Sequence, residues 1–303
     1  MNEKRLIVNA DDLGMNRGIT DAILIAHRHG IVTSASLMAN MRAAEYAIGQ
    51  LRRAPRLGVG VHLNICQGRP LLPESEVSSL LDAAGNFLAP GAIMRKLWRW
   101  QAAERQIEAE FRAQIQWMKN RGIHPTHADS HHHMHLYPAA IRPFARAVQA
   151  EGIPCARSPR CGVWPKNGRI AAAHRGTALR RVLVQSYRSA LQSTVLRGVS
   201  TPDSRVSCPP SERGNLDALR GHWKAAFENL PEGTFELVCH PGIAEPGFSE
   251  ADAIGVQREL ELRVLMDPEL RVTLDRCGVA LITYRELGVR HAARAQAAGV
   301  AAS

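Results

Sequence analysis

Short apolar runs alternate with amphipathic segments along most of the chain. The runs 6–10 and 57–63 have the length of buried strands, and both lead into polar residues. Between them, Ile19, Ile23 and Ala26 recur at the spacing of one helix face. The repeated order of strand and then helix favours a parallel sheet covered by helices.

Applied to the whole chain, the pattern predicts strands over 6–10, 31–40, 57–64, 153–157, 235–239 and 279–283, and helices over 18–29, 43–53, 107–122, 138–151, 178–196, 223–230, 256–266 and 270–276. Residues 66–100 are rich in Pro and Gly and are expected to form a long loop. Six or seven strand–helix units in one chain favour an α/β protein with a single distorted (β/α) TIM-like barrel over two domains. The barrel is expected over residues 1–290, with a basic amphipathic insertion at about 158–205 and a frayed, Ala-rich tail at 291–303.

Composition places the chain among folded proteins. It has 303 residues, of which 45% are hydrophobic and 22% charged. The sequence has no apolar run near the roughly 20 residues of a membrane helix, and residues 1–5 lead directly into a strand rather than a signal sequence. A cytoplasmic location is therefore expected, and the six scattered cysteines, with no Cys-x-x-Cys pair, are expected to be reduced.

The charge is uneven as well as positive. The net charge is +10, and arginines gather between residues 169 and 197. Because no nucleic-acid-binding motif accompanies this charge, no nucleic acid partner is expected. A basic amphipathic segment is instead typical of contact with an anionic surface, so peripheral contact with the inner face of a membrane is a further expectation.

The stretch 126–135 holds five of the thirteen histidines. In an extended strand His131, His133 and His135 would share one face with Asp129. Neutral imidazole is the commonest metal ligand among side chains, so a metal site is favoured over an exposed polar turn. Spacing alone leaves open which of the three histidines is a ligand.

Polar residues also follow other predicted strands. Asp11 and Asp12 come after the first, His62 lies at the end of the third, and His240 follows a late one. In a β/α barrel the carboxyl ends of all strands face one mouth, where active sites lie. Two histidines and one carboxylate leave coordination positions open for water and substrate, while the second carboxylate stays free as a base.

Four segments, in this order, resemble the YdjC-like carbohydrate deacetylases: 9–14 (NADDLG), 60–64 (GVHLN), 126–135 (THADSHHHMH) and 239–242 (CHPG). Residues 283–286 are similar to the C-terminal signature of that family, and the resemblance covers residues 5–288. The family includes chitooligosaccharide deacetylases and a hopanoid-biosynthesis branch that removes acetyl from an N-acetylglucosaminyl lipid.

The resemblance implies metal-dependent hydrolysis of the acetamido group of an N-acetylglucosamine-type sugar, with release of acetate. It implies that Asp12, His62 and His131 hold one divalent ion, magnesium or zinc. Asp11 would be the base and His240 the acid that protonates the leaving amine. Supporting or substrate-binding roles are expected for Asp129, His133, His135, Asn64, Arg157 and Arg285.

The chain departs from the smaller-substrate members at 158–205, and Cys161 stands where an acidic residue is usual after Pro159-Arg160. This departure favours an N-acetylated glycolipid, the hopanoid substrate, over a chitooligosaccharide. The alternatives are a chitooligosaccharide deacetylase, another metal-dependent amidohydrolase or phosphoesterase on the same barrel, and a non-enzymatic His-rich metal-binding or membrane-surface protein. A homo-oligomer is compatible with the sequence.

Overall fold

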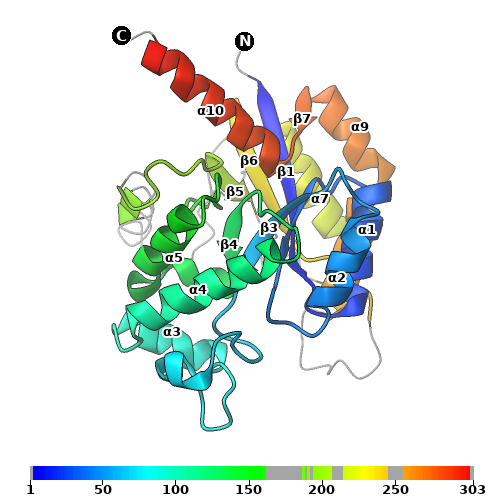
Figure 1. Cartoon of the computed structure of the whole chain (residues 1–303). Coiled ribbons are helices and arrows are strands. Elements are labelled where there is room, and N and C mark those ends of the chain that lie inside the picture. The colour runs from blue at the N-terminus through cyan, green and yellow to red at the C-terminus, as the bar shows by residue number, and fades with distance from the viewer. Residues whose placement is uncertain are drawn as a thin grey trace.

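The computed structural model of the chain describes residues 3–161, 186–187, 190–191, 194–206, 214–244 and 255–300, with side chains up to residue 293. In this part of the chain seven parallel strands form one curled sheet (Figure 1). The strands are β1 (Lys4–Leu13), β2 (Ser34–Leu37), β3 (Gly58–Leu63), β4 (Ala128–Ser130), β5 (Ser204–Val206), β6 (Gly233–Cys239) and β7 (Val279–Leu281). Their order is β4-β3-β2-β1-β6-β5, and β7 also pairs with β1.

The two ends of this sheet are linked by the segment 155–161. Ala156 bridges to Ala128 of β4, while Cys161 bridges to Arg205 of β5. Both bridges are parallel, so the sheet curls around towards a closed ring. The expected distorted β/α barrel of parallel strands is therefore confirmed.

Helices cover the outside of the sheet (Figure 1). They are α1 (Arg17–His29), α2 (Ala44–Leu51), α3 (Pro90–Trp98), α4 (Glu104–Lys119), α5 (Pro138–Ala150), α7 (Leu216–Glu228), α8 (Gly255–Leu265), α9 (Pro268–Arg276) and α10 (Tyr284–Val300). Local sequence fixes several helix starts: the Asn16 side chain accepts a hydrogen bond from the backbone N–H of Ile19 at 2.7 Å, and Pro138 opens α5. None of the described helices has the length and apolar character needed to cross a membrane.

The first strand is irregular where its polar residues begin. The β1–β2 register shifts between Ala10 and Leu13, and Asp12 has a left-handed backbone with φ of 68°. Such bulges re-aim side chains beside functional sites. Here the bulge lets Asp11 and Asp12 face different partners.

Three expectations about secondary structure are wrong. The segment 66–100 is not a continuous loop, because it contains α3 and the short turns η1 (Glu74–Glu76) and η2 (Ser78–Leu80). The strand expected over 153–157 is reduced to isolated bridges at Cys155 and Ala156. The strand expected over 31–40 is limited to β2. The predicted helix at 178–196 and most of the expected insertion lie outside the described residues.

Candidate metal centre

Strand register brings the polar side chains together at the carboxyl ends of the strands. In the β3–β4 pair His62 lies opposite Asp129, and in the β1–β6 pair Ala10 lies opposite Cys239. The second pairing places Asp11 beside His240. Residues far apart in sequence thus meet because their strands are neighbours, as expected for a barrel mouth.

Asp12, His62 and His131 converge on one point. Asp12 Oδ1 lies 3.3 Å from His62 Nε2 and 3.0 Å from His131 Nδ1, and the two imidazole nitrogens are 3.3 Å apart. All three side chains are buried. Three potential ligand atoms therefore form a nearly equilateral triangle.

The triangle fits a divalent metal ion. Ligand bonds of about 2.1 Å place neighbouring ligand atoms roughly 3.0 Å apart in octahedral and roughly 3.4 Å apart in tetrahedral geometry. The observed separations lie within that range and do not select the metal. Asp12 Oδ1 is also buried and accepts no hydrogen bond that meets ordinary geometric criteria, which is the state expected of an atom that faces a cation.

A guanidinium from α8 fixes the other oxygen of Asp12. Arg258 Nη2 donates to Asp12 Oδ2 at 2.6 Å. Burial alone would raise the pKa of Asp12, but the charges of Arg258 and of His131 outweigh it and hold that pKa well below its usual value. Asp12 is thus an anion with one oxygen occupied and one directed at the two imidazoles.

Asp11 has a different environment. Arg157 donates to both its oxygens, from Nη1 to Oδ2 at 2.8 Å and from Nη2 to Oδ1 at 2.6 Å. Although burial raises the pKa of Asp11, the charge of Arg157 exceeds that effect, and the net pKa is lowered. His240 Nε2 lies 3.8 Å from Asp11 Oδ2, and the His240 side chain is 36% exposed, so this imidazole stands where a substrate can reach it.

Asp129 connects His62 of the triangle to Arg157, which binds Asp11. Its Oδ1 lies 2.6 Å from His62 Nδ1, and its Oδ2 lies 2.7 Å from Arg157 Nη2. Burial would lower the pKa of His62, but the carboxylates of Asp129 and Asp11 raise it to about 10. Because Nδ1 is held by Asp129, Nε2 is the nitrogen that faces Asp12 and an ion.

The histidine stretch is not an extended strand beyond Ser130. β4 ends there, and a tight turn, η3 (His131–Leu136), follows with left-handed backbone at His132 and His133. The turn forms because Ser130 Oγ accepts a hydrogen bond from the backbone N–H of His135 at 2.9 Å. The expectation that His131, His133 and His135 share one face is therefore wrong.

The turn sends the later histidines away from Asp12. His133 Nε2 contacts Arg205. His135 Nδ1 lies 2.6 Å from Ser130 Oγ, and its ring stacks on Phe144 with centroids 4.7 Å apart. Of the three histidines that the spacing left open, only His131 belongs to the triangle with Asp12 and His62.

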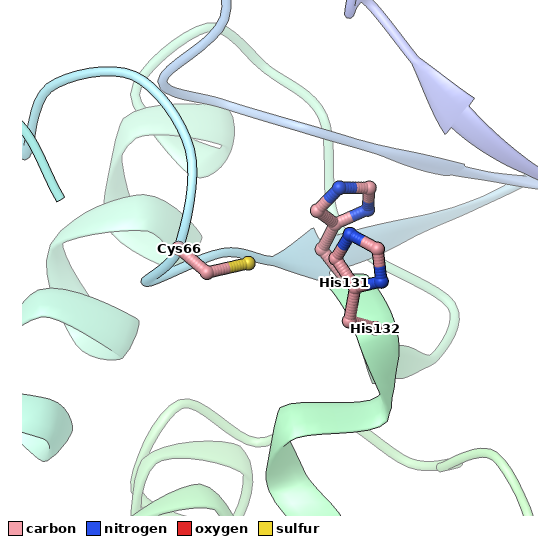
Figure 2. A group of neighbouring side chains, drawn as sticks. All are labelled: Cys66, His131 and His132. Carbon is pink, nitrogen blue, oxygen red and sulfur yellow. The ribbon is translucent and has the colours of Figure 1, made fainter. Parts of the chain in front are cut away.

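Cys66 and His132 lie beside His131. Figure 2 shows the Cys66 thiol directed towards the two imidazoles, and potential ligand atoms of the three residues lie within 4.8 Å of one another. Burial raises the pKa of Cys66 to about 12, however, so forming the thiolate that binds a metal costs more here than at an exposed cysteine. The triangle, whose Asp12 carboxylate has a pKa well below its usual value, is therefore the stronger ligand set.

Two other expected residues have distinct positions. Asn64 is buried, donates to the backbone oxygen of Gln67 at 2.7 Å and accepts from the backbone N–H of Cys66, so it shapes the loop after β3. Arg285 lines a separate pocket with Leu51 and Gly122 and is not among the residues that surround Asp12.

Sequence reasoning missed several members of this site. Ser36 Oγ lies within hydrogen-bond distance of Asp129, His62 and Asp11, and Glu236 accepts two hydrogen bonds from Arg157. Both are polar residues within buried strands, and that feature is the signal that could have found them. Arg258 lies on a helix of weak amphipathic pattern, where no comparable signal exists.

The fold and the site together define a parallel β/α barrel with a candidate mononuclear metal centre at its mouth. The YdjC-like protein family model matches residues 5–276, and the chain belongs to this family. It is 33% identical to a carbohydrate deacetylase of Geobacillus stearothermophilus over 281 residues, which cover 92% of this chain and 96% of that protein. It is 32% identical to a carbohydrate deacetylase of Mus musculus, over 93% of this chain and 94% of that protein.

Among solved structures, one from Enterococcus faecalis V583, assigned provisionally to cellobiose-phosphate cleavage, superposes with a TM-score of 0.75 at 25% identity. The superposition covers 94% of this chain and 99% of the Enterococcus faecalis chain. The similarity thus extends over nearly the whole of both molecules.

Proposed function

We propose that this protein is a metal-dependent carbohydrate deacetylase, which hydrolyses the N-acetyl group of an N-acetylglucosamine-type sugar to the free amine and acetate. The observation that carries this proposal is the pair of adjacent carboxylates with separate partners. Asp12 faces two imidazoles, whereas Asp11 is held beside them by Arg157. Relatives named as carbohydrate deacetylases support the same reading.

Asp12, His62 and His131 would hold the ion, which when bound polarises a carbonyl and lowers the pKa of water. Asp12 would be committed to the ion, because Arg258 binds one of its oxygens and the other faces the two imidazoles. Asp11 lies outside this triangle and is kept ionised by Arg157, which binds both its oxygens. Asp11 is therefore the carboxylate assigned to accept the proton from the attacking water.

His240 is suited to the opposite transfer. Its ring is partly exposed at the mouth, 3.8 Å from Asp11 Oδ2, and its backbone N–H donates to Glu261 of α8 at 2.6 Å. An imidazole so placed can donate a proton to the nitrogen of the departing sugar amine. The acetamido group would lie at the mouth beside both of these side chains.

The substrate is proposed more narrowly as an N-acetylglucosaminyl group on a hopanoid lipid, on the departure of the sequence at 158–205 from the smaller-substrate members. Acetate release should be measured with an N-acetylglucosaminyl hopanoid and with diacetylchitobiose. Turnover of the sugar oligomer alone would remove the lipid assignment and leave the deacetylase. No acetate from either would remove both.

Asp11→Asn tests the reaction itself. Loss of the base should lower kcat by roughly 10²–10⁴-fold, while one ion per chain remains bound because the triangle is intact. Asp217→Asn, on α7 with an 87% exposed side chain, is the matched control and should keep full activity. Undiminished turnover in Asp11→Asn would contradict the assigned role.

A further inference from the structure

Two tryptophans stand exposed on the excursion between β3 and α4. Trp98 is 67% exposed at the end of α3, and Trp100 is 54% exposed two residues later. Trp223, by contrast, is fully buried in the core. Contiguous exposed apolar surface marks sites of interaction, and two exposed tryptophans only two residues apart are a candidate for such a site.

The backbone keeps Trp100 in this position. Its φ is 56°, a left-handed conformation that is rare for a bulky residue. A hydrogen bond from the Gln101 N–H to the Lys96 carbonyl oxygen, at 2.9 Å, closes the turn that contains Trp100. Ala102, two residues later, is buried again. Strain of this kind is maintained by the surrounding structure and is typical of functional segments.

Three exposed arginines accompany these tryptophans in the sequence. Arg95 lies in the last turn of α3, Arg99 is the C-cap residue directly after Trp98, and Arg105 lies in the first turn of α4. None of the three has an ion-pair partner in the part of the chain that the structure describes. The nearby carboxylates of α4, Glu104 and Glu108, are both engaged by Arg146. We call these two tryptophans and three arginines the Trp–Arg surface.

We propose that the Trp–Arg surface docks on an anionic lipid bilayer. Tryptophan is enriched where a membrane meets water, since its ring is apolar and its N–H is polar. Guanidinium groups bind lipid phosphates and are drawn to the negative surface potential. The buried residues of α3, Ile93 and Leu97, face the protein, so the helix offers its opposite face to the bilayer.

Exposed tryptophans also stack on carbohydrate polymers, so a polymer is the alternative occupant of the Trp–Arg surface. The charge of this surface favours a membrane. A neutral sugar gains nothing from three uncompensated arginines, and a deacetylated sugar carries an amine that they repel. Figure 1 places α3 at the end of the molecule opposite the N-terminus, which is the end towards which the parallel strands run. α3 therefore lies at the end of the molecule that holds the mouth of the barrel.

Co-sedimentation of the full-length protein with vesicles of phosphatidylcholine, with and without 30% phosphatidylserine, tests the proposal. Binding is expected to the anionic vesicles and to weaken as salt is raised. The double variant Trp98→Ser/Trp100→Ser should bind roughly tenfold more weakly. Arg99→Glu should lose more than about fivefold, since one arginine near the surface contributes about that factor.

Matched controls lie on α9, away from α3 (Figure 1). Arg271→Glu changes the net charge by the same amount, and Val272→Ser removes an apolar side chain that is 63% exposed. Both should bind vesicles nearly as the wild type does. All variants should keep the far-UV circular dichroism spectrum and the thermal midpoint of the wild type, which verifies their folding whether or not the deacetylase proposal holds.

Three results would overturn the proposal. Wild-type protein that fails to sediment with anionic vesicles at low salt has no such surface. Equal losses in Arg99→Glu and Arg271→Glu would show attraction by overall charge alone. Unchanged vesicle binding in the tryptophan variant, with weakened binding to chitooligosaccharide, would make the surface a sugar platform.

Discussion

The pKa of buried histidine side chains is shifted in opposite directions in two neighbouring regions of the barrel. His62, at the mouth, is surrounded by carboxylates that raise its pKa to about 10. His127 and His135, deeper in the structure, have pKa values lowered to about 3, chiefly by burial. His127 stacks on Tyr284 with centroids 3.8 Å apart, and His135 stacks on Phe144.

All three imidazoles are buried, so burial alone does not separate a ligand from a core residue. The difference is direct contact with a carboxylate: His62 Nδ1 lies 2.6 Å from Asp129 Oδ1, whereas His127 Nδ1 lies 3.0 Å from the Thr126 hydroxyl. Arg205 is the largest charge acting on His135. The dense histidine stretch thus contains one candidate ligand, His131, together with packing residues. Carboxylate partners distinguish the two, and the following predictions test that distinction.

The largest effect is expected from removing a mouth histidine. His62→Ala should abolish stoichiometric binding of a divalent ion and lower deacetylation by at least about 10³-fold, because it removes a ligand of the triangle. His135→Ala should still bind one ion per chain, although the protein is less stable. The two variants are compared by their metal content after gel filtration, and circular dichroism verifies their folding. Loss of the ion from both variants would contradict the distinction between ligand and packing histidines.

A smaller effect is expected when only the partner of the ligand changes. Asp129→Asn keeps the shape of the side chain but removes the charge that orients His62, and the affinity for metal should fall by about 10–100-fold. Competition with a chelator measures this affinity. Asp203→Asn, whose Oδ2 accepts from the backbone N–H of Thr234 far from His62, serves as the control. An unchanged affinity in Asp129→Asn would show that His62 needs no such partner.

The smallest effect concerns the dependence of stability on pH. His127 and His135 have folded-state pKa values below the unfolded value of about 6.5, so the unfolded chain binds more protons. The contribution of these two groups to the free energy of unfolding is therefore fully present above about pH 6.5. It decreases as the pH falls towards 3, by at most about 1.4 kcal/mol per pH unit for each group. In the metal-free protein the effect of His62 has the opposite sign, because its contribution to the free energy of unfolding is lost as the pH rises from about 6.5 to about 10.

Urea midpoints of the metal-free protein at pH 7.5 and 5.5 measure this slope. His135→Phe retains a ring against Phe144 and should show a smaller decrease between the two pH values than the wild type. A decrease of the same size in both would mean that other groups carry the acid sensitivity.

Hydrophobic period and polar strand ends were enough to predict the barrel and a mouth where polar residues of several strands meet. The choice of Asp12, His62 and His131 came from the resemblance to the YdjC-like family, because spacing alone left His131, His133 and His135 open. The partners could not be found in this way. Arg258 reaches Asp12 across 246 positions of sequence, and Ser36 is one small polar residue in a short strand.

The path of the chain after Ser130 also lay beyond sequence reasoning. One hydrogen bond from the His135 N–H to the Ser130 hydroxyl, together with left-handed backbone at His132 and His133, replaces extended structure. Alternation of side chains holds only while a strand lasts. The helix α3 was missed because its apolar pattern is only two turns long.

The ion pair between α8 and the β1 bulge has a consequence for biogenesis. A nascent chain exposes Asp12, His62 and His131 long before residue 258 leaves the ribosome. Until then the Asp12 carboxylate has no cationic side chain to hold its second oxygen and can rotate freely. Binding of an ion by Asp12, His62 and His131 would consequently be completed only after α8 has been synthesised and has packed against the barrel.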